Sequence, residues 1–221
     1  MVAMVCEMLH GRHCTFGAVR RRVAHPRFLM VLLSVVAAAC SATGSNAPTS
    51  TRPQTPDLKA MPVTARELPP GYSAARADSG IPPCNFQQVL TDGAVGRAQV
   101  SFASDSASEL VFFTELLVAQ TEERVDAQYS RTVARLKGCR RFDTGESDLG
   151  TMTGQPITLP RVGESSAGFR FVVSVGGVNV PQYLVVARFA SVEAAFTGLG
   201  GNTVEFERLI AVASADLART R

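Results

Sequence analysis

The sequence predicts a single α+β domain over residues 63–221, mainly an antiparallel sheet of about five strands with two helices packed on it. Three observations predict this class. Short runs of β-branched and aromatic residues alternate with turns rich in Gly, Pro and Ser. Two longer stretches carry apolar residues at helical spacing. Runs of strands separated by few helices favour an antiparallel sheet with its helices on one face.

Residues 1–39 predict a signal peptide. The run 28–39, FLMVLLSVVAAA, is apolar and uncharged, and four arginines lie shortly before it. A bilayer span needs about 20 residues, so this run is too short to cross, and it has the basic-then-apolar order of a secretion signal. The leader is longer than a signal needs, which favours a translation start nearer Val19.

The residues Ala37-Ala38-Ala39-Cys40 resemble the lipobox of bacterial lipoproteins, although Leu usually stands where this chain has Ala37. The resemblance implies that Cys40 is acylated, for example with palmitate, and becomes the first residue of the mature protein. An ordinary signal cleaved after the alanines and a buried helix are the alternatives. Residues 40–62 are expected to form the lipid anchor and a flexible tether, because 41–55 has almost no large apolar side chains to offset the entropy of ordering.

The first half of the domain predicts two strands and a helix. Residues 97–102 and 109–118 are expected to be strands, with Ser104 to Ser106 as the turn between them. Over 121–137 the apolar spacing changes to that of a helix, which Thr121 is expected to cap and Gly138 to end.

The second half predicts three strands and a closing helix. The strands are expected at 156–162, 168–175 and 182–189, with a hairpin turn at 174–177. A helix follows over 203–218, with Asn202 and Glu205 in a capping-box arrangement.

The charge of the chain does not indicate a nucleic-acid-binding protein. Five of the 22 basic residues and one of the 19 acidic residues precede Cys40. The mature chain would therefore carry 17 basic and 18 acidic residues and be close to neutral. A nucleic-acid partner would need a clustered basic face, and none is indicated. All three histidines, at 10, 13 and 25, lie in the leader, so the mature chain lacks imidazole for a catalytic triad or a metal site. The sequence therefore predicts no enzyme, no cofactor and no metal.

Cys84 and Cys139 are the two cysteines besides Cys40 that remain after processing. In an oxidising compartment such a pair is expected to form a disulfide. The alternative, a reactive thiol pair, lacks the close spacing and the basic setting that lower a thiol pKa.

Three sequence motifs superficially resemble functional sites, namely a calcium loop, a serine nucleophile and an anion-binding loop, but none has the required pattern. Asp143, Glu146 and Asp148 lack the spacing of a calcium loop, so a solvated turn is expected. The stretch 163–168 has serines between glycines but no Gly-x-Ser-x-Gly core. Residues 198–201 are glycine-rich before a helix start, but the glutamates that follow would repel an anion.

Several features occur together in the domain: Leu68-Pro69-Pro70-Gly71-Tyr72, the helix ending in Gly138-Cys139, Pro160-Arg161-Val162-Gly163, the strand 169–175 and the C-terminal helix. Together they resemble a group of actinobacterial, largely mycobacterial, cell-envelope lipoproteins whose domain is similar to the extracellular sensor domain of PknH-type kinases. The resemblance implies a sensor-like α+β domain with a cleft outside the cell. The kinase domains usually carry two disulfides, and this chain has cysteines for one.

Two functions from different classes follow. The first is a non-catalytic lipoprotein on the extracytoplasmic face of the cell membrane, whose domain binds a ligand or an envelope protein. The second is a carrier of lipid or another apolar ligand, which would need a continuous internal apolar cavity of several hundred Å³.

Overall fold

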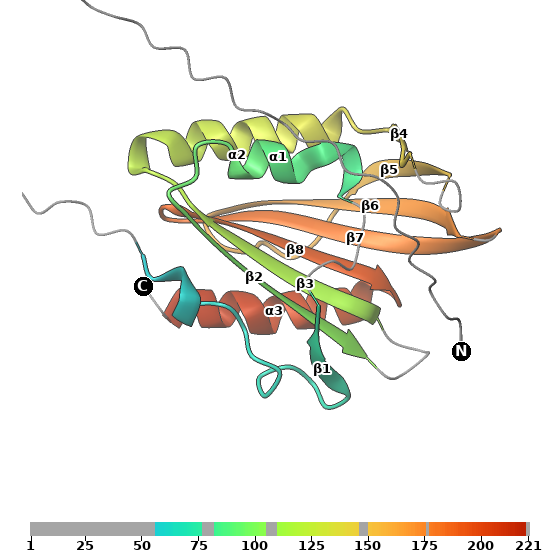
Figure 1. Cartoon of the computed structure of the whole chain (residues 1–221), viewed down its shortest axis with the longest axis horizontal. Helices are drawn as coiled ribbons and strands as arrows, with labels where there is room; N and C mark the ends of the chain where they lie inside the picture. The colour runs from blue at the N-terminus through green and yellow to red at the C-terminus, as the bar shows by residue number, and fades with distance from the viewer. Residues whose placement is uncertain (1–55, 77–81, 105–109, 146–149, 176, 220–221) are drawn as a thin grey trace, which may run out of the picture. The chain divides into compact units, whose positions relative to one another are not determined.

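The computed structural model describes residues 56–76, 82–104, 110–145, 150–175 and 177–219. In these residues eight antiparallel strands form one sheet, in the order β1-β2-β3-β8-β7-β6-β5-β4 (Figure 1). The strands are β1 (Tyr72–Ala75), β2 (Gly96–Ser104), β3 (Leu110–Ala119), β4 (Arg141–Asp143), β5 (Thr151–Ile157), β6 (Ser165–Val175), β7 (Val178–Phe189) and β8 (Val192–Gly200).

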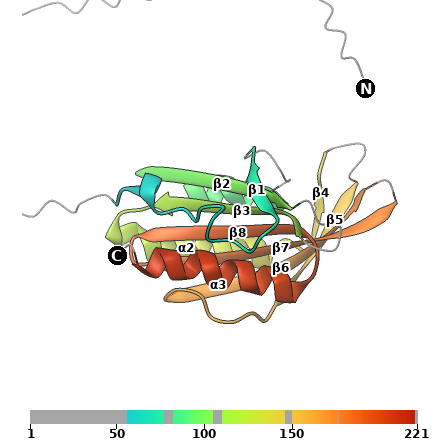
Figure 2. The same ribbon diagram turned by 90° about the horizontal axis from the view of Figure 1, so that it is seen from below.

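Helices cover both faces of this sheet. Two short 3-10 turns, η1 (Leu58–Ala60) and η2 (Pro83–Asn85), accompany α1 (Phe86–Thr91), α2 (Glu122–Lys137) and α3 (Thr203–Arg219). Figure 1 shows α1 and α2 on one side of the sheet, and Figure 2 shows α3 lying across the other side. The expectation that the helices pack on one face was therefore wrong. No helix in the described part of the chain is long and apolar enough to span a membrane.

The middle of β7 shows why both faces need cover. Tyr183, Val185 and Ala187 point to the apolar cluster under α3, and Leu184 and Val186 point to the cluster under α1 and α2. All five are buried, because side chains alternate between the faces of a strand. A continuous apolar run of this kind is typical of a strand covered on both sides.

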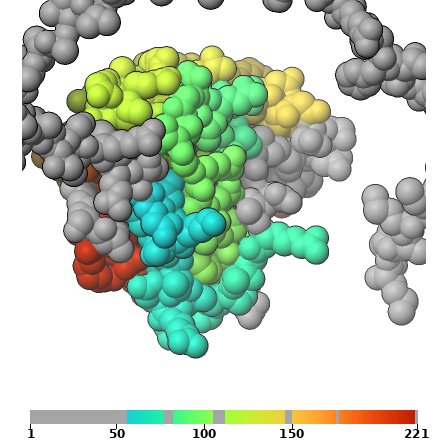
Figure 3. Space-filling view, turned by 60° about the vertical axis from the view of Figure 1, so that its left-hand side comes forward, coloured from blue at the N-terminus to red at the C-terminus, as the bar shows by residue number. Residues whose placement is uncertain are grey.

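The segment before β1 belongs to the α3 side of the core. Leu58, Met61, Val63 and Leu68 are buried in the same cluster as the apolar face of α3. In Figure 3 this segment (cyan) lies at the surface between α3 (red) and the part of the chain that includes β2 and β3 (green). The tether expected over residues 40–62 includes Leu58 and Met61, so the packed part of the chain begins before residue 63.

The number of strands differs from the expected five, because β1, β4 and β8 were not expected as strands. The largest difference is β8, the central strand between β3 and β7. The strand expected at 156–162 is also wrong, since β5 ends at Ile157 and the chain then leaves the sheet. The expected strands at 97–102, 109–118, 168–175 and 182–189 lie within or next to β2, β3, β6 and β7.

The ends of the two long helices are formed as follows. Thr121 precedes α2 in an extended conformation, and its side chain makes no capping hydrogen bond, contrary to expectation. Its carbonyl accepts from the amides of Arg124 and Val125 instead. At α3 the side chain of Asn202 accepts from the Glu205 amide at 3.0 Å, and Glu205 accepts from the Tyr72 hydroxyl at 2.8 Å. Glu205 thus also ties β1 to α3.

Candidate functional site

A groove of about 520 Å³ lies between α3 and the segment 158–164 that connects β5 to β6. Its base is formed by Val162, Phe189 and Ile210, all buried in the α3-side cluster. One wall is the face of α3 from Glu207 to Ala218, and the other runs from Leu159 to Glu164. A pocket of this volume lies within the usual range for small-molecule sites.

The connecting segment forms a fixed wall because hydrogen bonds hold it to the sheet. The amide of Val162 donates to the Ser166 hydroxyl at 3.1 Å, and the amide of Glu164 donates to the Arg188 carbonyl at 2.9 Å. The guanidinium of Arg161 donates to the Glu164 carbonyl and tightens the turn further. The wall is therefore built before any ligand arrives, which lowers the entropic cost of binding.

The side chain of Glu164 adds two further contacts to this segment, one with a backbone amide and one with an arginine side chain. Its Oε1 accepts from the Ala190 amide at 3.1 Å, and its Oε2 lies 2.9 Å from a guanidinium nitrogen of Arg188. Arg188 also pairs with Asp126 on α2 at 2.6 Å. The groove wall is thus linked through Arg188 to the helix on the opposite face of the sheet.

Gly163 allows the wall to approach β7 closely. Its φ is +63°, in the left-handed region, and an added Cβ would lie 2.4 Å from the Arg188 carbonyl oxygen. Only glycine fits there without displacing backbone. This explains the glycine of the motif at 160–163 in physical terms.

The groove lining carries three ionisable side chains, those of Arg161, Glu164 and Glu207. Glu164 is paired with Arg188. Arg161 is exposed and turned toward its own segment, whereas Glu207 is half-buried in the α3 wall. The remainder of the lining is largely aliphatic or aromatic, so the site is apolar with a few polar groups at its rim.

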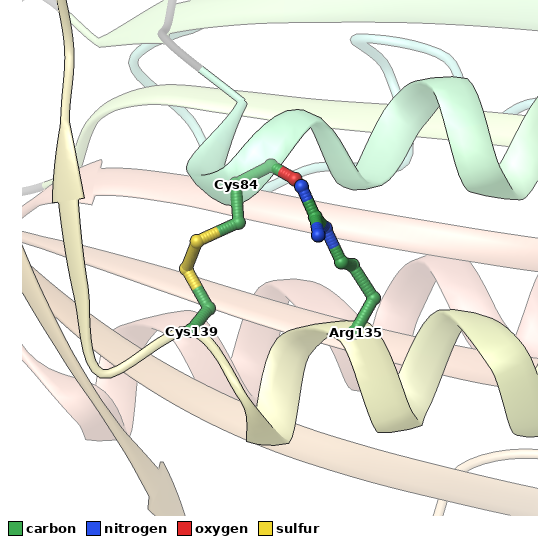
Figure 4. The surroundings of a disulfide bond; sticks show 3 residues. All are labelled: Cys84, Arg135 and Cys139. Carbon is green, nitrogen blue, oxygen red and sulfur yellow. A yellow bond between two sulfur atoms is a disulfide. The ribbon is translucent and has the colours of Figure 1, made fainter.

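Cys84 and Cys139 are joined in a disulfide, with Cα atoms 6.0 Å apart (Figure 4). The bond connects η2 to the end of α2, and the Arg135 side chain beside it donates to the Cys84 carbonyl at 2.9 Å. Both cysteines are buried. A bond this well covered is suited to structural support, and it lies outside the groove lining.

The other residues singled out from the sequence do not join the groove. Cys40 lies outside the described residues, as do Glu146 and Asp148, and Asp143 is in β4. Residues 198–200 belong to β8 rather than to a loop that could hold an anion. In the described residues, no group of three or more His, Cys, Asp or Glu side chains could hold a metal ion.

Two buried glutamates, one on each face of the sheet, were not predicted. Glu115 accepts from the Val63 amide at 2.8 Å, and burial raises its pKa to about 8. Glu193 faces Arg131 of α2, and neither of its carboxyl oxygens has a hydrogen-bond partner among the described residues. Burial raises the pKa of Glu193 to about 8 as well, partly offset by the charge of Arg131. Both glutamates are outside the groove lining.

The groove itself was not predicted from the sequence, although both of its walls were noticed separately. A signal was present in α3, where Ala211, Ser214, Ala215 and Ala218 place small side chains on one helical face. Small residues on one exposed face leave room for something to pack there. Which segment lies opposite depends on the path of the chain after β5, which the sequence pattern did not show.

The fold and the groove define a class: an α+β domain with one antiparallel sheet between helical layers, a buried disulfide and a surface groove beside its last helix. No protein-family model matches the chain, and no curated protein matches its sequence. Among solved structures, its fold is similar to that of the extracellular domain of PknH from Mycobacterium tuberculosis. The TM-score is 0.55 at 12% identity, over 74% of this chain and 94% of that one. The part of the sequence resemblance that concerns the PknH-type extracellular domain is thereby confirmed at the level of the fold.

Proposed function

We propose that this chain is a non-catalytic, lipid-anchored protein of the extracytoplasmic membrane face, and that its domain binds a ligand in the groove between α3 and residues 158–164. The observation that carries the proposal is the groove itself, with one wall fixed by hydrogen bonds and an apolar base. The leader sequence, the buried disulfide and the fold shared with an extracellular domain support an exported location.

A ligand-binding role is favoured over catalysis by the chemistry of the lining. The mature chain has no histidine, and the three ionisable groups of the groove are one arginine and two glutamates. One of these glutamates, Glu164, is occupied by Arg188 and the Ala190 amide. This set suits the recognition of a ligand better than proton transfer to one.

The carrier hypothesis is less favoured because the space beneath α3 is filled. Phe113 packs on Phe196 and Phe206, with ring centroids 6.4 and 6.5 Å apart, and all three are fully buried. Phe206 also stacks on Tyr183 at 5.4 Å. Aromatic side chains therefore occupy the interior where a carrier would enclose its cargo.

The proposal can be tested by copurification. The full chain and its Ala211→Leu/Ala215→Leu variant are isolated from membranes of the native host, and bound small molecules are compared by mass spectrometry. Leucine preserves helix propensity and fills the groove from the exposed α3 face, so a molecule enriched with the wild type should be lost from the variant. Ala127→Leu, an exposed change on α2, is the matched control and should retain it. Equal recovery from all three proteins would contradict the proposed site.

A further inference from the structure

The α3 wall of the groove is long. The lining positions 207, 210, 211, 214, 215 and 218 recur every three or four residues, so they lie along one face of the helix. From Glu207 to Ala218 the helix rises roughly 16 Å, at 1.5 Å per residue. Alanine and serine occupy the second half of this wall, so they leave a mainly apolar strip along which a linear chain can lie.

Polarity changes along this wall. Glu207 lies at its first end, and the positions that follow toward Ala218 are apolar except for Ser214. In the described residues, no hydrogen bond or ion pair reaches the carboxylate of Glu207. A half-buried carboxylate without a partner has lost part of its hydration, so a charge-assisted hydrogen bond from a ligand stabilises it modestly.

The other charges of the groove do not compete for the same partner. The carboxylate of Glu164 is already bound by Arg188 and by the Ala190 amide. Arg161 is exposed to water, and its guanidinium donates to the Glu164 carbonyl. Among the described residues, Glu207 is therefore the half-buried charged group of the groove lining without a hydrogen-bond or ion-pair partner, whereas Arg161 is exposed.

We infer that the ligand of this groove is an amphipathic cation, with a linear apolar chain lying along α3 toward Ala218 and a primary amine or similar cationic group at Glu207. This inference rests on the proposed function and adds the ligand class. A fatty acid of the same length would fill the apolar part equally well but would bring its carboxylate against Glu207. The groove should thus discriminate by the sign of the head group.

Photolabelling of the full chain in membranes tests this inference. Two probes carry the same mid-chain diazirine, one a dodecylamine and the other a dodecanoate. After irradiation, trypsin releases both groove walls as separate peptides, residues 162–170 and 209–219, and their labelling is quantified by mass spectrometry. We expect the amine to label both peptides about two- to fivefold more than the carboxylate, the range of one partly exposed ion pair.

Variants separate the head group from the groove. Glu207→Gln should reduce amine labelling to the level of the carboxylate, while Glu123→Gln, an exposed change on α2, should leave the preference intact. Ala211→Leu/Ala215→Leu should abolish labelling by both probes. If the carboxylate labels as strongly as the amine, or Glu207→Gln has no effect, the inferred head group is wrong although the groove still binds. If neither probe labels these peptides, or the leucine variant labels normally, the proposed binding site itself is wrong.

Discussion

Glu193 is a single side chain whose ionisation affects the whole fold. It lies between the sheet and α2 with both carboxyl oxygens unpartnered among the described residues, and burial raises its pKa from 4.5 to about 8. The folded state therefore holds this proton at pH values where the unfolded state has released it. Between about pH 4.5 and pH 8 the free energy of unfolding falls as the pH rises. Glu115, with a pKa of about 8 on the other face, contributes in the same direction.

Glu193→Gln should flatten part of this pH dependence, because an amide keeps the shape of the side chain and cannot ionise. The variant should be roughly 1–3 kcal/mol more stable than wild type at pH 8 and close to wild type at pH 5. Urea denaturation at both pH values measures the difference, with the exposed Glu123→Gln as control. An unchanged pH profile in the variant would show that Glu193 is ionised in the fold.

Gly163→Ala tests the geometry of the groove wall. The variant combines a left-handed backbone with a Cβ 2.4 Å from the Arg188 carbonyl oxygen, and it should lose about 3 kcal/mol of stability. Gly145 provides a matched control, since its φ is +73° and an added Cβ meets nothing within 4 Å. Gly145→Ala should lose only about 1 kcal/mol. Equal losses in chemical denaturation would mean that the wall yields to the added methyl group.

At the scale of elements, the disulfide fixes η2 and α1 to the end of α2. Its loop spans 55 residues, so removing the bond should cost about 4 kcal/mol in the chain-entropy model. We expect the double variant Cys84→Ala/Cys139→Ala to unfold at lower urea concentration than oxidised wild type. Reduced wild type should behave like the variant, because both lack the same constraint. A reductant that leaves the wild-type transition unchanged would place the stabilising effect elsewhere.

Sequence patterns predicted the elements with strong local signals. The helices near 121–137 and 203–218 carry clear apolar faces, and β6 and β7 carry β-branched and aromatic residues. In contrast, β8 contains Ala194, Ala195, Gly198 and Gly200, which have low strand propensity. It is a strand because β3 and β7 flank it on both sides and leave room for small side chains. Tertiary context overrides local preference there.

The candidate site could not be predicted for the same reason, because its position depends on tertiary contacts rather than on local sequence patterns. Gly154 interrupts the apolar pattern that indicates a strand, yet β5 continues through it. The Phe171 ring on the neighbouring strand occupies the space that a Cβ at Gly154 would need, so glycine is the residue that fits there. The strand β5 runs from Thr151 to Ile157 rather than over the expected 156–162, and the residues that follow it form the groove wall. Its motif was visible in the sequence, but its position opposite α3 follows from pairing that local patterns do not encode.

At the scale of the whole molecule, the anchor expected at Cys40 determines where the groove can act. Between Cys40 and Leu58 the chain can span at most about 60 Å, so an acylated Cys40 would keep the domain near the membrane surface. Amphipathic molecules are concentrated at such a surface. The inferred ligand class and the expected anchor are therefore consistent with one another, although each rests on separate observations.

The expected anchor gives a test of its own. Each buried methylene contributes about 0.8 kcal/mol and a single chain holds only marginally, so stable retention needs more than one acyl chain on Cys40. Cys40→Ala should therefore move the protein from the membrane fraction to the soluble extracytoplasmic fraction, or leave it as an uncleaved precursor. Fractionation combined with intact-mass measurement distinguishes these outcomes from wild type, which should carry the mass of its acyl chains. Wild-type protein without acyl mass would favour the ordinary cleaved signal, and normal membrane retention of a processed Cys40→Ala protein would place the anchor elsewhere.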